Sequence, residues 1–214
     1  NDIKKYNIAF LALESILFAV FFSLDLISFY LFFEAVLIPM YFIVGIYGSR
    51  KRRIRAAYLL FLYTLISSIL MFISILYLYF LTGTTDFQTI KLIQLPTFVE
   101  RLCWIAFFFS FAVKMPLIPF HIWLPEAHCE APTAGSVILA GVLLKLGSYG
   151  FLRFSVGLFA ETSAFFSPFI FTISILGVIY ASLTTLQQID LKKIIAYSSV
   201  GHMAIVTIGI FSFN

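Results

Sequence analysis

Long apolar stretches separated by short polar breaks run along the whole chain. Each stretch is long enough to cross a hydrocarbon core about 30 Å thick as a helix rising about 1.5 Å per residue. Seven in succession cannot be a signal peptide. The pattern therefore predicts an all-α, polytopic membrane protein of about seven transmembrane helices, at residues 7–24, 29–48, 54–82, 103–124, 132–154, 166–186 and 193–213.

The composition agrees with lipid as the solvent. Of the 214 residues, 62% are hydrophobic and 11% are charged, whereas a soluble domain has about 25% charged residues. The formal net charge is +4, but the basic residues lie in the breaks between spans and form no nucleic-acid-binding face. Cys103 and Cys129 do not form a disulfide framework.

The basic residues predict an orientation. Under seven crossings, one side receives most of them, namely Lys4, Lys5, Arg50, Lys51, Arg52, Arg53, Arg55, Lys192 and Lys193. The opposite side receives Lys91, Arg101 and Arg153. By the positive-inside rule, the N-terminus is expected on the cytoplasmic or matrix side. The segment from Pro125 to Pro132, expected as a loop on that same side, carries no Lys or Arg.

Glu14, Glu34, Lys114 and Lys145 are charged residues well inside predicted spans, and for Glu14 the alternative is a helix-interface carboxyl or a contact with another subunit. A lysine at mid-membrane costs about 2.5–3.5 kcal/mol on insertion scales, so it is expected to face a partner or a hydrated cavity. Burial lowers the pKa of a lysine and a nearby carboxylate raises it, so a lysine under both influences can exchange a proton. We predict that Glu34 is the counter-charge of Lys114. The alternative is a static ion pair that locks two helices together.

The fourth span is interrupted by Pro116, Pro119 and Pro125. Each proline lacks a backbone donor and clashes with the carbonyl four residues earlier. Broken membrane helices occur where they line a protein-enclosed or watery cavity. Lys114 is therefore predicted to lie at a functional break, the alternative being a merely kinked helix.

Three histidines are candidate proton-relay groups because a neutral imidazole has one donor and one acceptor and titrates near neutrality. His121 is expected near the face of Lys114 if the helix resumes its register; His202 lies within the last span, and His128 in the turn after the fourth. The alternative is a structural hydrogen bond from each. We predict no metal site from His121, His128 and Cys129, because no fourth ligand is evident.

The glycines of the fifth span are a further feature. Gly141 and Gly147 flank Lys145, and small residues let membrane helices approach closely. They are expected either to bring Lys145 near its relay partners or to serve close packing alone.

Three segments carry a family resemblance. Residues 114–147 read KMPLIPFHIWLPEAHCEAPTAGSVILAGVLLKLG, residues 33–39 read FEAVLIP, and residues 188–202 read QIDLKKIIAYSSVGH. Together they closely resemble the antiporter-like subunits of the membrane arm of respiratory NADH dehydrogenase (complex I), and within that family the subunit 4 branch.

The resemblance implies roles for named residues. Glu34 matches the family's buried carboxylate, Lys114 the pumping lysine of its broken helix, and Lys145 the lysine of the next helix. His202 matches a relay residue, and His121 and His128 match further family histidines. In that picture, quinone reduction elsewhere in the complex shifts the pairing of Glu34 with Lys114, which then passes a proton along Lys145 and the histidines.

The resemblance also implies partners and a location. We expect other complex I membrane-arm subunits as partners, especially the sibling antiporter-like subunits, with lipid around them and no nucleic acid. We expect no cofactor on this chain, because no Cys cluster for iron–sulfur ligation and no GxGxxG fingerprint occurs; NADH, FMN, iron–sulfur clusters and ubiquinone belong to other subunits. The expected location is the mitochondrial inner membrane, or alternatively a bacterial plasma membrane.

The family has an inverted-repeat architecture, of which the second repeat is expected to be incomplete here. Residues 1–165 would form the first five-helix unit and residues 166–214 the start of the second. A faint internal echo, Ser15-Ile-Leu against Ser174-Ile-Leu, lies five spans apart, as an inverted repeat requires. The start at Asn1 suggests a central fragment or a split-gene product, completed by a separate chain or by a missing remainder.

Two other functions stay open. One is a subunit of a related cation/proton antiporter or membrane-bound hydrogenase, which would share the Lys and Glu pattern but would not co-purify with the iron–sulfur subunits of complex I. The other is a structural membrane spacer, in which the buried charges only hold helices together.

Overall fold

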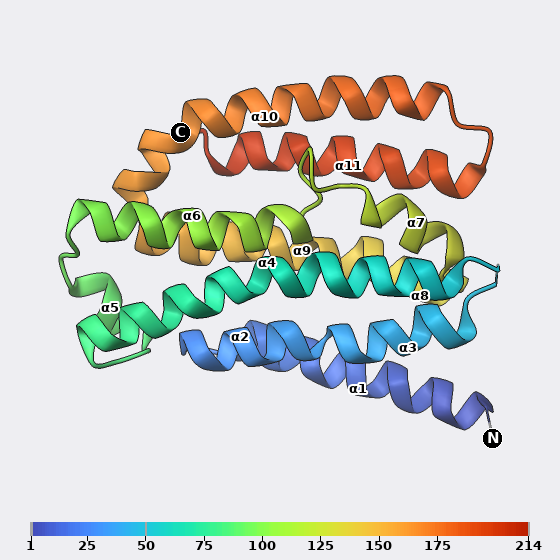
Figure 1. Ribbon diagram of the computed structural model, residues 1–214, viewed down its shortest axis with the longest axis horizontal. Helices are drawn as coiled ribbons and strands as arrows, with labels where there is room; N and C mark the ends of the chain where they lie inside the picture. Colours follow the sequence, from blue (N-terminus) through green and yellow to red (C-terminus); the bar gives the residue numbers. More distant parts are fainter. Residues whose placement is uncertain (1, 50, 214) are drawn as a thin grey trace.

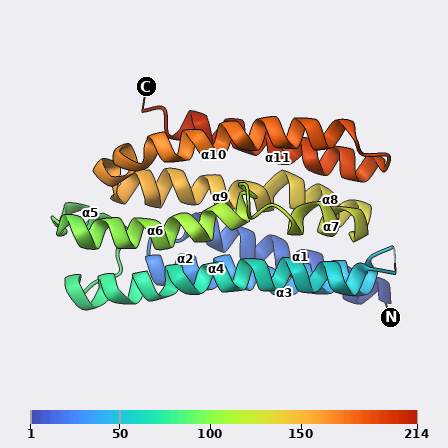
Figure 2. The same cartoon turned by 45° about the horizontal axis from the view of Figure 1, so that its top comes forward.

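The computed structural model describes residues 2–49 and 51–213, which form a bundle of long helices with roughly aligned axes (Figure 1). Within these ranges the regular structure is helical, apart from a single β-bridge between Asp25 and Asp86. α10 and α11 pack along each other at one side of the bundle, and α1 and α3 lie at the opposite side (Figures 1 and 2). The prediction of an all-α polytopic fold is confirmed.

The helices follow the predicted spans, with shifted ends and added breaks. Their bounds are α1 Asp2–Phe22, α2 Leu26–Ala35, α3 Leu37–Tyr47, α4 Arg53–Thr82, α5 Phe87–Leu92, α6 Thr97–Lys114, α7 Trp123–Glu130, α8 Thr133–Ile138, α9 Leu144–Gly150, α10 Ala160–Leu186 and α11 Leu191–Ile210. The π-helical segment η1 Leu139–Leu143 joins α8 to α9, and a second one, η2 Phe151–Val156, extends α9, which gives one continuous helix over 133–156. The boundary expected between residues 165 and 166 falls inside α10.

Six helices of the described chain are long and apolar enough to cross a membrane. The span predicted at 103–124 is not among them, because the structure divides it into α6 and α7. Helix α6 alone carries Glu100, Arg101 and Lys114. The segment from Pro125 to Pro132, expected as a loop, is mostly the helix α7.

A second break lies in the span predicted at 29–48. Helix α2 ends at Ala35 and α3 begins at Leu37, so the two halves meet at Val36. Pro39 has no backbone N–H to offer the carbonyl four residues earlier, at Ala35, which accounts for an interruption at this point. Glu34 therefore lies at the end of a half-helix rather than inside a regular one.

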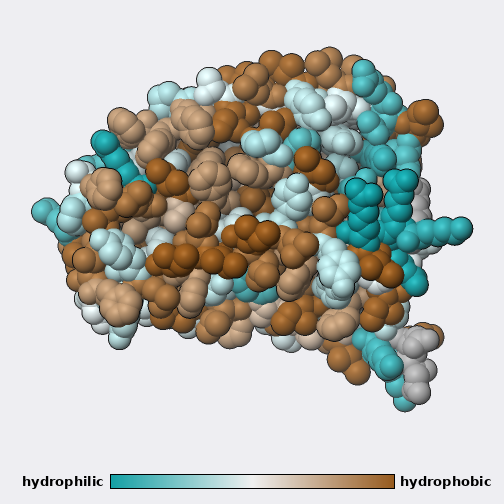
Figure 3. Space-filling model, in the orientation of Figure 1, coloured by the Kyte–Doolittle hydropathy of each residue, from teal (hydrophilic) through white to brown (hydrophobic). Residues whose placement is uncertain are grey.

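The predicted grouping of the basic segments is seen in the fold. The N-terminus, the α3–α4 connection and the α10–α11 turn lie at one end of the bundle (Figure 1), where hydrophilic residues gather while hydrophobic ones cover the flank (Figure 3). Ser49 N–H donates to Glu130 O at 3.0 Å, and Lys192 Nζ donates to Ala131 O at 3.0 Å, so α7 also ends there. Arg50 lies outside the described residues.

An aromatic core joins the first helices to the broken one. Phe29, Phe107, Phe111 and Phe154, from α2, α6 and η2, are fully buried. Their rings contact one another with centroids 4.3–6.4 Å apart. Such offset and edge-to-face contacts each stabilise beyond area burial, by about 0.5–1.5 kcal/mol. This core fixes the end of α6 against α2, the two elements that carry Lys114 and Glu34.

Candidate functional site: a buried lysine at a helix break

The break after α6 is stabilised by protein groups. The N–H of Leu117 bonds to Ala112 O at 2.9 Å, five residues earlier, so Val113 O has lost its regular partner. The indole Nε1–H of Trp123 donates to Val113 O at 2.9 Å and replaces it. Because an unpaired carbonyl is costly in lipid, this bond lowers the cost of irregular backbone in a bundle of membrane helices.

Lys114 is the last residue of α6 and only 3% exposed. Its Nζ donates to Phe33 O at 2.9 Å and lies 3.6 Å from the centroid of the Phe33 ring. A cation over an aromatic face is attracted by the ring quadrupole, more strongly where water is excluded. The ammonium therefore contacts the residue directly before Glu34, through a carbonyl and a ring.

Glu34 lies close to Lys114 but does not bond to it. Both carboxylate oxygens are buried and have no hydrogen-bond partner in the described chain. The groups that face them include Lys114, Tyr30 and the Ser68 hydroxyl, and Ser68 donates to Leu65 O at 2.9 Å. The structure thus holds the two opposite charges near each other with their direct bond unmade.

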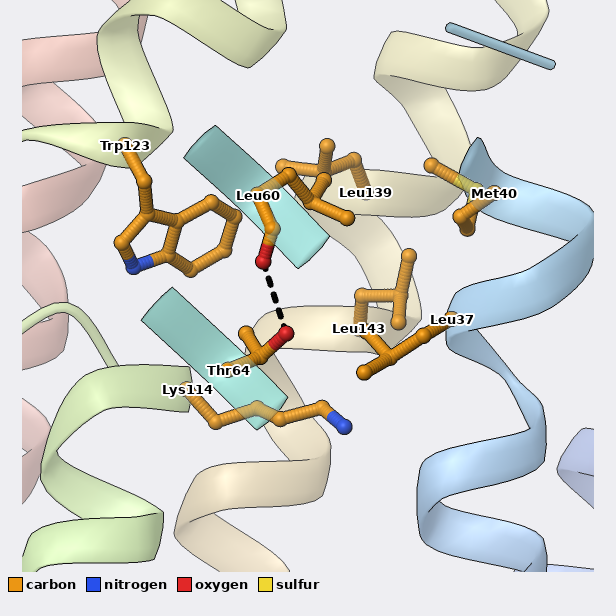
Figure 4. Close-up of a pocket in the computed structure, with 8 residues that line it drawn as sticks. All are labelled: Leu37, Met40, Leu60, Thr64, Lys114, Trp123, Leu139 and Leu143. Carbon is orange, nitrogen blue, oxygen red and sulfur yellow. Dashed lines mark hydrogen bonds between the residues drawn. The ribbon is translucent and has the colours of Figure 1, made fainter. Parts of the chain in front are cut away.

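A small apolar cavity opens beside the Lys114 side chain (Figure 4). It has a volume of about 10 Å³ and is lined by Lys114, Trp123, Leu37, Met40, Leu60, Thr64, Leu139 and Leu143. Figure 4 shows the lysine reaching from α6 past Thr64 toward the half-helices α2 and α3. The surface that these residues expose to the cavity is apolar, although Lys114 and Thr64 both carry polar groups.

Lys145 does not join this group. Its side chain is exposed in the described chain, and its Nζ donates to Ala140 O at 2.6 Å, within the same continuous helix. The flanking glycines act differently from each other: a Cβ at Gly147 would lie 2.9 Å from Met115 Cβ, whereas one at Gly141 would meet nothing within 4 Å. Gly147 brings the helix close to the break, but the lysine head points away from it.

His121 is expected near the face of Lys114 only if the helix resumes its register, and the helix does not resume it. His121 is buried in the break, with its ring centroid 5.2 Å from that of Tyr180 in α10 and 6.3 Å from that of Tyr197 in α11. The prolines interrupt the helical register between residues 114 and 121, so a spacing of two turns no longer predicts a shared direction. Its Nδ1 has no hydrogen-bond partner.

The other two histidines occupy different places. His128 is 5% exposed in α7, near Lys192 at the basic end, and its Nε2 has no hydrogen-bond partner. His202 is exposed on α11 and lines a groove of about 280 Å³ with Tyr197 and with hydroxyl side chains of α10 and α11. In the part of the chain that the structure describes, no group of three His, Cys, Asp or Glu side chains could hold a metal ion.

Several site residues were not singled out from the sequence. Thr64 and Ser68 are buried hydroxyls of α4 that face Lys114 and Glu34, and Glu130 is a carboxylate only 4% exposed with one unpartnered oxygen. A signal was present for the hydroxyls, because Thr64 and Ser68 are spaced four residues apart and so share one face of an otherwise apolar helix. No comparable pattern marked Glu130, whose burial depends on the packing of α7.

A bundle of long apolar helices that encloses a lysine and a carboxylate at a proline break defines a polytopic membrane protein with buried ionisable groups. The family model described as NADH:quinone oxidoreductase/Mrp antiporter, TM, matches residues 23–214. The chain belongs to this family, which confirms the resemblance found in the sequence.

Named relatives agree with this assignment. The chain is 65% identical over 214 residues to NADH-ubiquinone oxidoreductase chain 4 of Chondrus crispus, and 62% identical over 211 residues to the protein of that name from Marchantia polymorpha. The two matches include 100% and 99% of this chain, but only 44% and 43% of the length of the relatives. The chain therefore spans less than half the length of the curated relatives it matches.

Solved structures show the same fold. A chain of respiratory complex I from Thermus thermophilus with bound NADH superposes with a TM-score of 0.90 at 32% identity, over 97% of this chain and 44% of that one. A chain of an archaeal membrane-bound sulfane sulfur reductase superposes with a TM-score of 0.86 at 23% identity, over 97% and 43%. The second likeness concerns the fold alone.

Proposed function

We propose that the chain forms part of a proton-translocating membrane-arm subunit of NADH:ubiquinone oxidoreductase. Glu34 and Lys114 would be its first proton-carrying pair, and Lys145, His121, His128 and His202 would continue the relay. The observation that carries the proposal is the arrangement of Lys114: a buried ammonium at a helix break, next to a buried carboxylate that has no bonding partner.

This arrangement suits proton transfer better than a static helix clamp. A buried clamp is stabilised when its charges bond to each other, and an unpaired buried charge is costly. Here the lysine bonds to Phe33 O while the Glu34 oxygens stay unpartnered. Transfer of the Lys114 ammonium from Phe33 O to the Glu34 carboxylate would make the direct pair, so the site would have two arrangements that hold a proton differently.

The test is a pair of Lys114 substitutions in the complete subunit within its assembled complex. Lys114→Ala removes the proton carrier, and Lys114→Arg keeps a charge that cannot be released near neutrality. Both are expected to lower quinone-coupled proton translocation in sealed vesicles about a hundredfold, the lower end of what a positioned acid–base group contributes. NADH oxidation by an artificial acceptor at the peripheral arm would report assembly.

The same measurements separate the alternatives. If the charges only hold helices together, Lys114→Arg should pump as well as the wild type, which would contradict the proposal. If the chain serves a cation antiporter or a hydrogenase, it should purify without the iron–sulfur subunits that oxidise NADH.

The proposed function also implies partners, a cellular membrane and a division into repeat units. The partners would be the other membrane-arm subunits, especially the sibling antiporter-like ones, and the redox cofactors would belong to other subunits of the complex. The membrane would be the mitochondrial inner membrane, supported by eukaryotic relatives that are named ubiquinone oxidoreductases. Residues 1–165 and 166–214 would belong to the first and second units of the inverted repeat.

A further inference from the structure

A second cluster of titratable side chains lies where the broken helix meets α10 and α11. His121 comes from the break, Tyr180 from α10 and Tyr197 from α11. The His121 ring contacts both phenol rings, with its centroid 5.2 Å from that of Tyr180 and 6.3 Å from that of Tyr197. Glu126 of α7 lies near enough to Tyr197 to act on it electrostatically. The proposed relay uses His121 but assigns no role to these neighbours.

One nitrogen of the His121 ring is left without a hydrogen bond. The side chain is only 6% exposed, and its Nδ1 has no hydrogen-bond partner in the described chain. A buried polar atom in that state costs free energy and calls for an explanation. A phenol hydroxyl, which can both donate and accept, is the kind of partner that an imidazole nitrogen lacks here.

Tyr197 also lines the groove that holds His202. The two residues are five positions apart on α11, about 140° around the helix axis, so they border the groove from different sides. Three hydroxyls line the groove with them, from Ser182, Thr185 and Ser198. Each of these hydroxyls donates to a carbonyl of its own helix and keeps lone pairs free to accept. Tyr197 therefore contacts the buried histidine and shares a groove with the exposed one.

We propose that Tyr197 is a further relay residue, which carries a proton from His121 to the groove that holds His202. When the imidazole is protonated, its N–H proton passes to the phenol oxygen while the hydroxyl hydrogen leaves toward the groove. The imidazole becomes neutral, and the phenol is neutral before and after the step. This inference rests on the proposed function, which names both histidines but no group between them.

Tyr180 does not meet the same requirements. Its ring lies closer to His121, yet the residue is 44% exposed and is not among those that line the groove of His202. A proton given to Tyr180 would not reach that groove. Tyr180 is therefore a matched control, because it is a tyrosine that packs against the same histidine.

The test compares Tyr197→Phe, Tyr197→His and Tyr180→Phe in the complete subunit within the assembled complex. Phenylalanine keeps the ring and removes only the hydroxyl, and a neutral histidine restores one donor and one acceptor. Quinone-coupled proton translocation in sealed vesicles is the functional readout, and NADH oxidation by an artificial acceptor reports assembly. A map of the wild-type complex that resolves waters is the structural readout.

We expect Tyr197→Phe to lower proton translocation about tenfold. This is less than the roughly hundredfold contribution of a positioned acid–base group, because other hydroxyls of the groove partly replace the phenol. Tyr197→His should recover most of the rate, and Tyr180→Phe should pump like the wild type. The map should place Tyr197 Oη within hydrogen-bond distance of a His121 ring nitrogen, directly or through one water.

A wild-type map in which Tyr197 Oη lies farther than one bridging water from the His121 ring would overturn the inference, even if Tyr197→Phe fails to assemble. Equal losses in Tyr197→Phe and Tyr180→Phe would also contradict it, because only one of the two tyrosines lines the groove. Normal pumping by Tyr197→Phe, in a complex that loses pumping on Lys114→Ala, would refute the relay role and leave the proposed function standing. Normal pumping by Lys114→Ala would refute the proposed function, and this inference with it.

Discussion

At the scale of single residues, the site depends on which groups replace the bonds that the prolines remove. Trp123 supplies the donor that Val113 O lost at the break, and Phe33 O supplies the acceptor that Lys114 needs. Both partners come from outside the regular helix that carries the group they satisfy. The break and the buried lysine are therefore tolerated for the same physical reason, which is that Val113 O and Lys114 Nζ each have a protein partner in place of water.

Trp123→Phe tests this at the break. The substitution leaves Val113 O without a donor, which costs about 1–3 kcal/mol for a buried group. We expect a lower melting temperature of the assembled complex and faster amide exchange over residues 115–122. Trp104→Phe is the control, because its partner Ser163 keeps a bond to Ser155 O at 2.7 Å. Equal effects of the two substitutions would count against a special role for the Val113 bond.

At the scale of elements, the continuous helix over 133–156 packs closely against the broken helix because glycines occupy the contact positions. A Cβ at Gly147 would lie 2.9 Å from Met115 Cβ and 3.1 Å from Phe111 O, and one at Gly150 would lie 2.3 Å from the Phe111 ring. The π-helical turn η1 lies in the same helix just before Lys145, and such turns are frequent at functional sites. Close approach on one face thus coexists with an outward-facing lysine.

Gly147→Ala and Gly141→Ala separate packing from helix propensity. Alanine stabilises a helix relative to glycine by about 0.5–1 kcal/mol at either position. At Gly147 the added methyl collides with the backbone at the break, and overpacking costs about 1–3 kcal/mol. We expect Gly147→Ala to lower the melting temperature and slow proton translocation, and Gly141→Ala to do neither. A Gly147→Ala complex as stable as wild type would show that α9 can shift away from α6.

The short helix α5, outside the predicted spans, carries a pH-dependent cap. The Thr89 hydroxyl and then its backbone N–H donate to the Asp86 carboxylate, at 2.7 and 2.9 Å, and lower the pKa of Asp86 below its ordinary value of 3.8. A lowered folded pKa means that the cap stabilises α5 above the unfolded value and is lost as the pH falls through the folded one.

Asp86→Asn should remove this pH dependence, because asparagine can cap a helix but does not titrate. We expect the amide-exchange protection of Thr89, corrected for intrinsic rates, to decline on acidification toward pH 3 in the wild type and to stay level in Asp86→Asn. Parallel profiles for the two proteins would show that the carboxylate does not control the cap.

At the scale of the whole molecule, α10 and α11 carry polar groups on an outer face. Only 22% of the most apolar window of α10 and 33% of that of α11 is buried within the described chain. His202, Tyr197 and Ser198 line the groove on that face, and insertion energetics disfavour such groups against lipid.

We expect this groove to be covered by protein in the assembled complex, by helices of a separate chain or of a continuation of this one. A structure of the complex in its membrane should place protein side chains within hydrogen-bond distance of His202 and of the neighbouring hydroxyls. Lipid acyl chains in direct contact with the groove would refute this expectation. Helix α1 is the comparison for the groove, because its apolar window is only 11% buried within the described chain.

The sequence by itself determined the features that depend on local composition. Length and hydropathy predicted the spans because the bilayer sets a minimum apolar length, and the grouping of Lys and Arg predicted which connections share a side. Prolines 116 and 119 predicted the break after Lys114 because proline cannot continue the hydrogen-bond ladder. The quoted motifs predicted the family.

Only the tertiary structure decided where the chemical groups point. The predicted pairing of Glu34 with Lys114 is a near approach with the bond unmade, since Phe33 O and the ring compete for the ammonium. The register lost at the break turned His121 toward α10 and α11, and Lys145 reached a carbonyl of its own helix. These outcomes depend on contacts between helices far apart in the chain, which no pattern within one segment specifies.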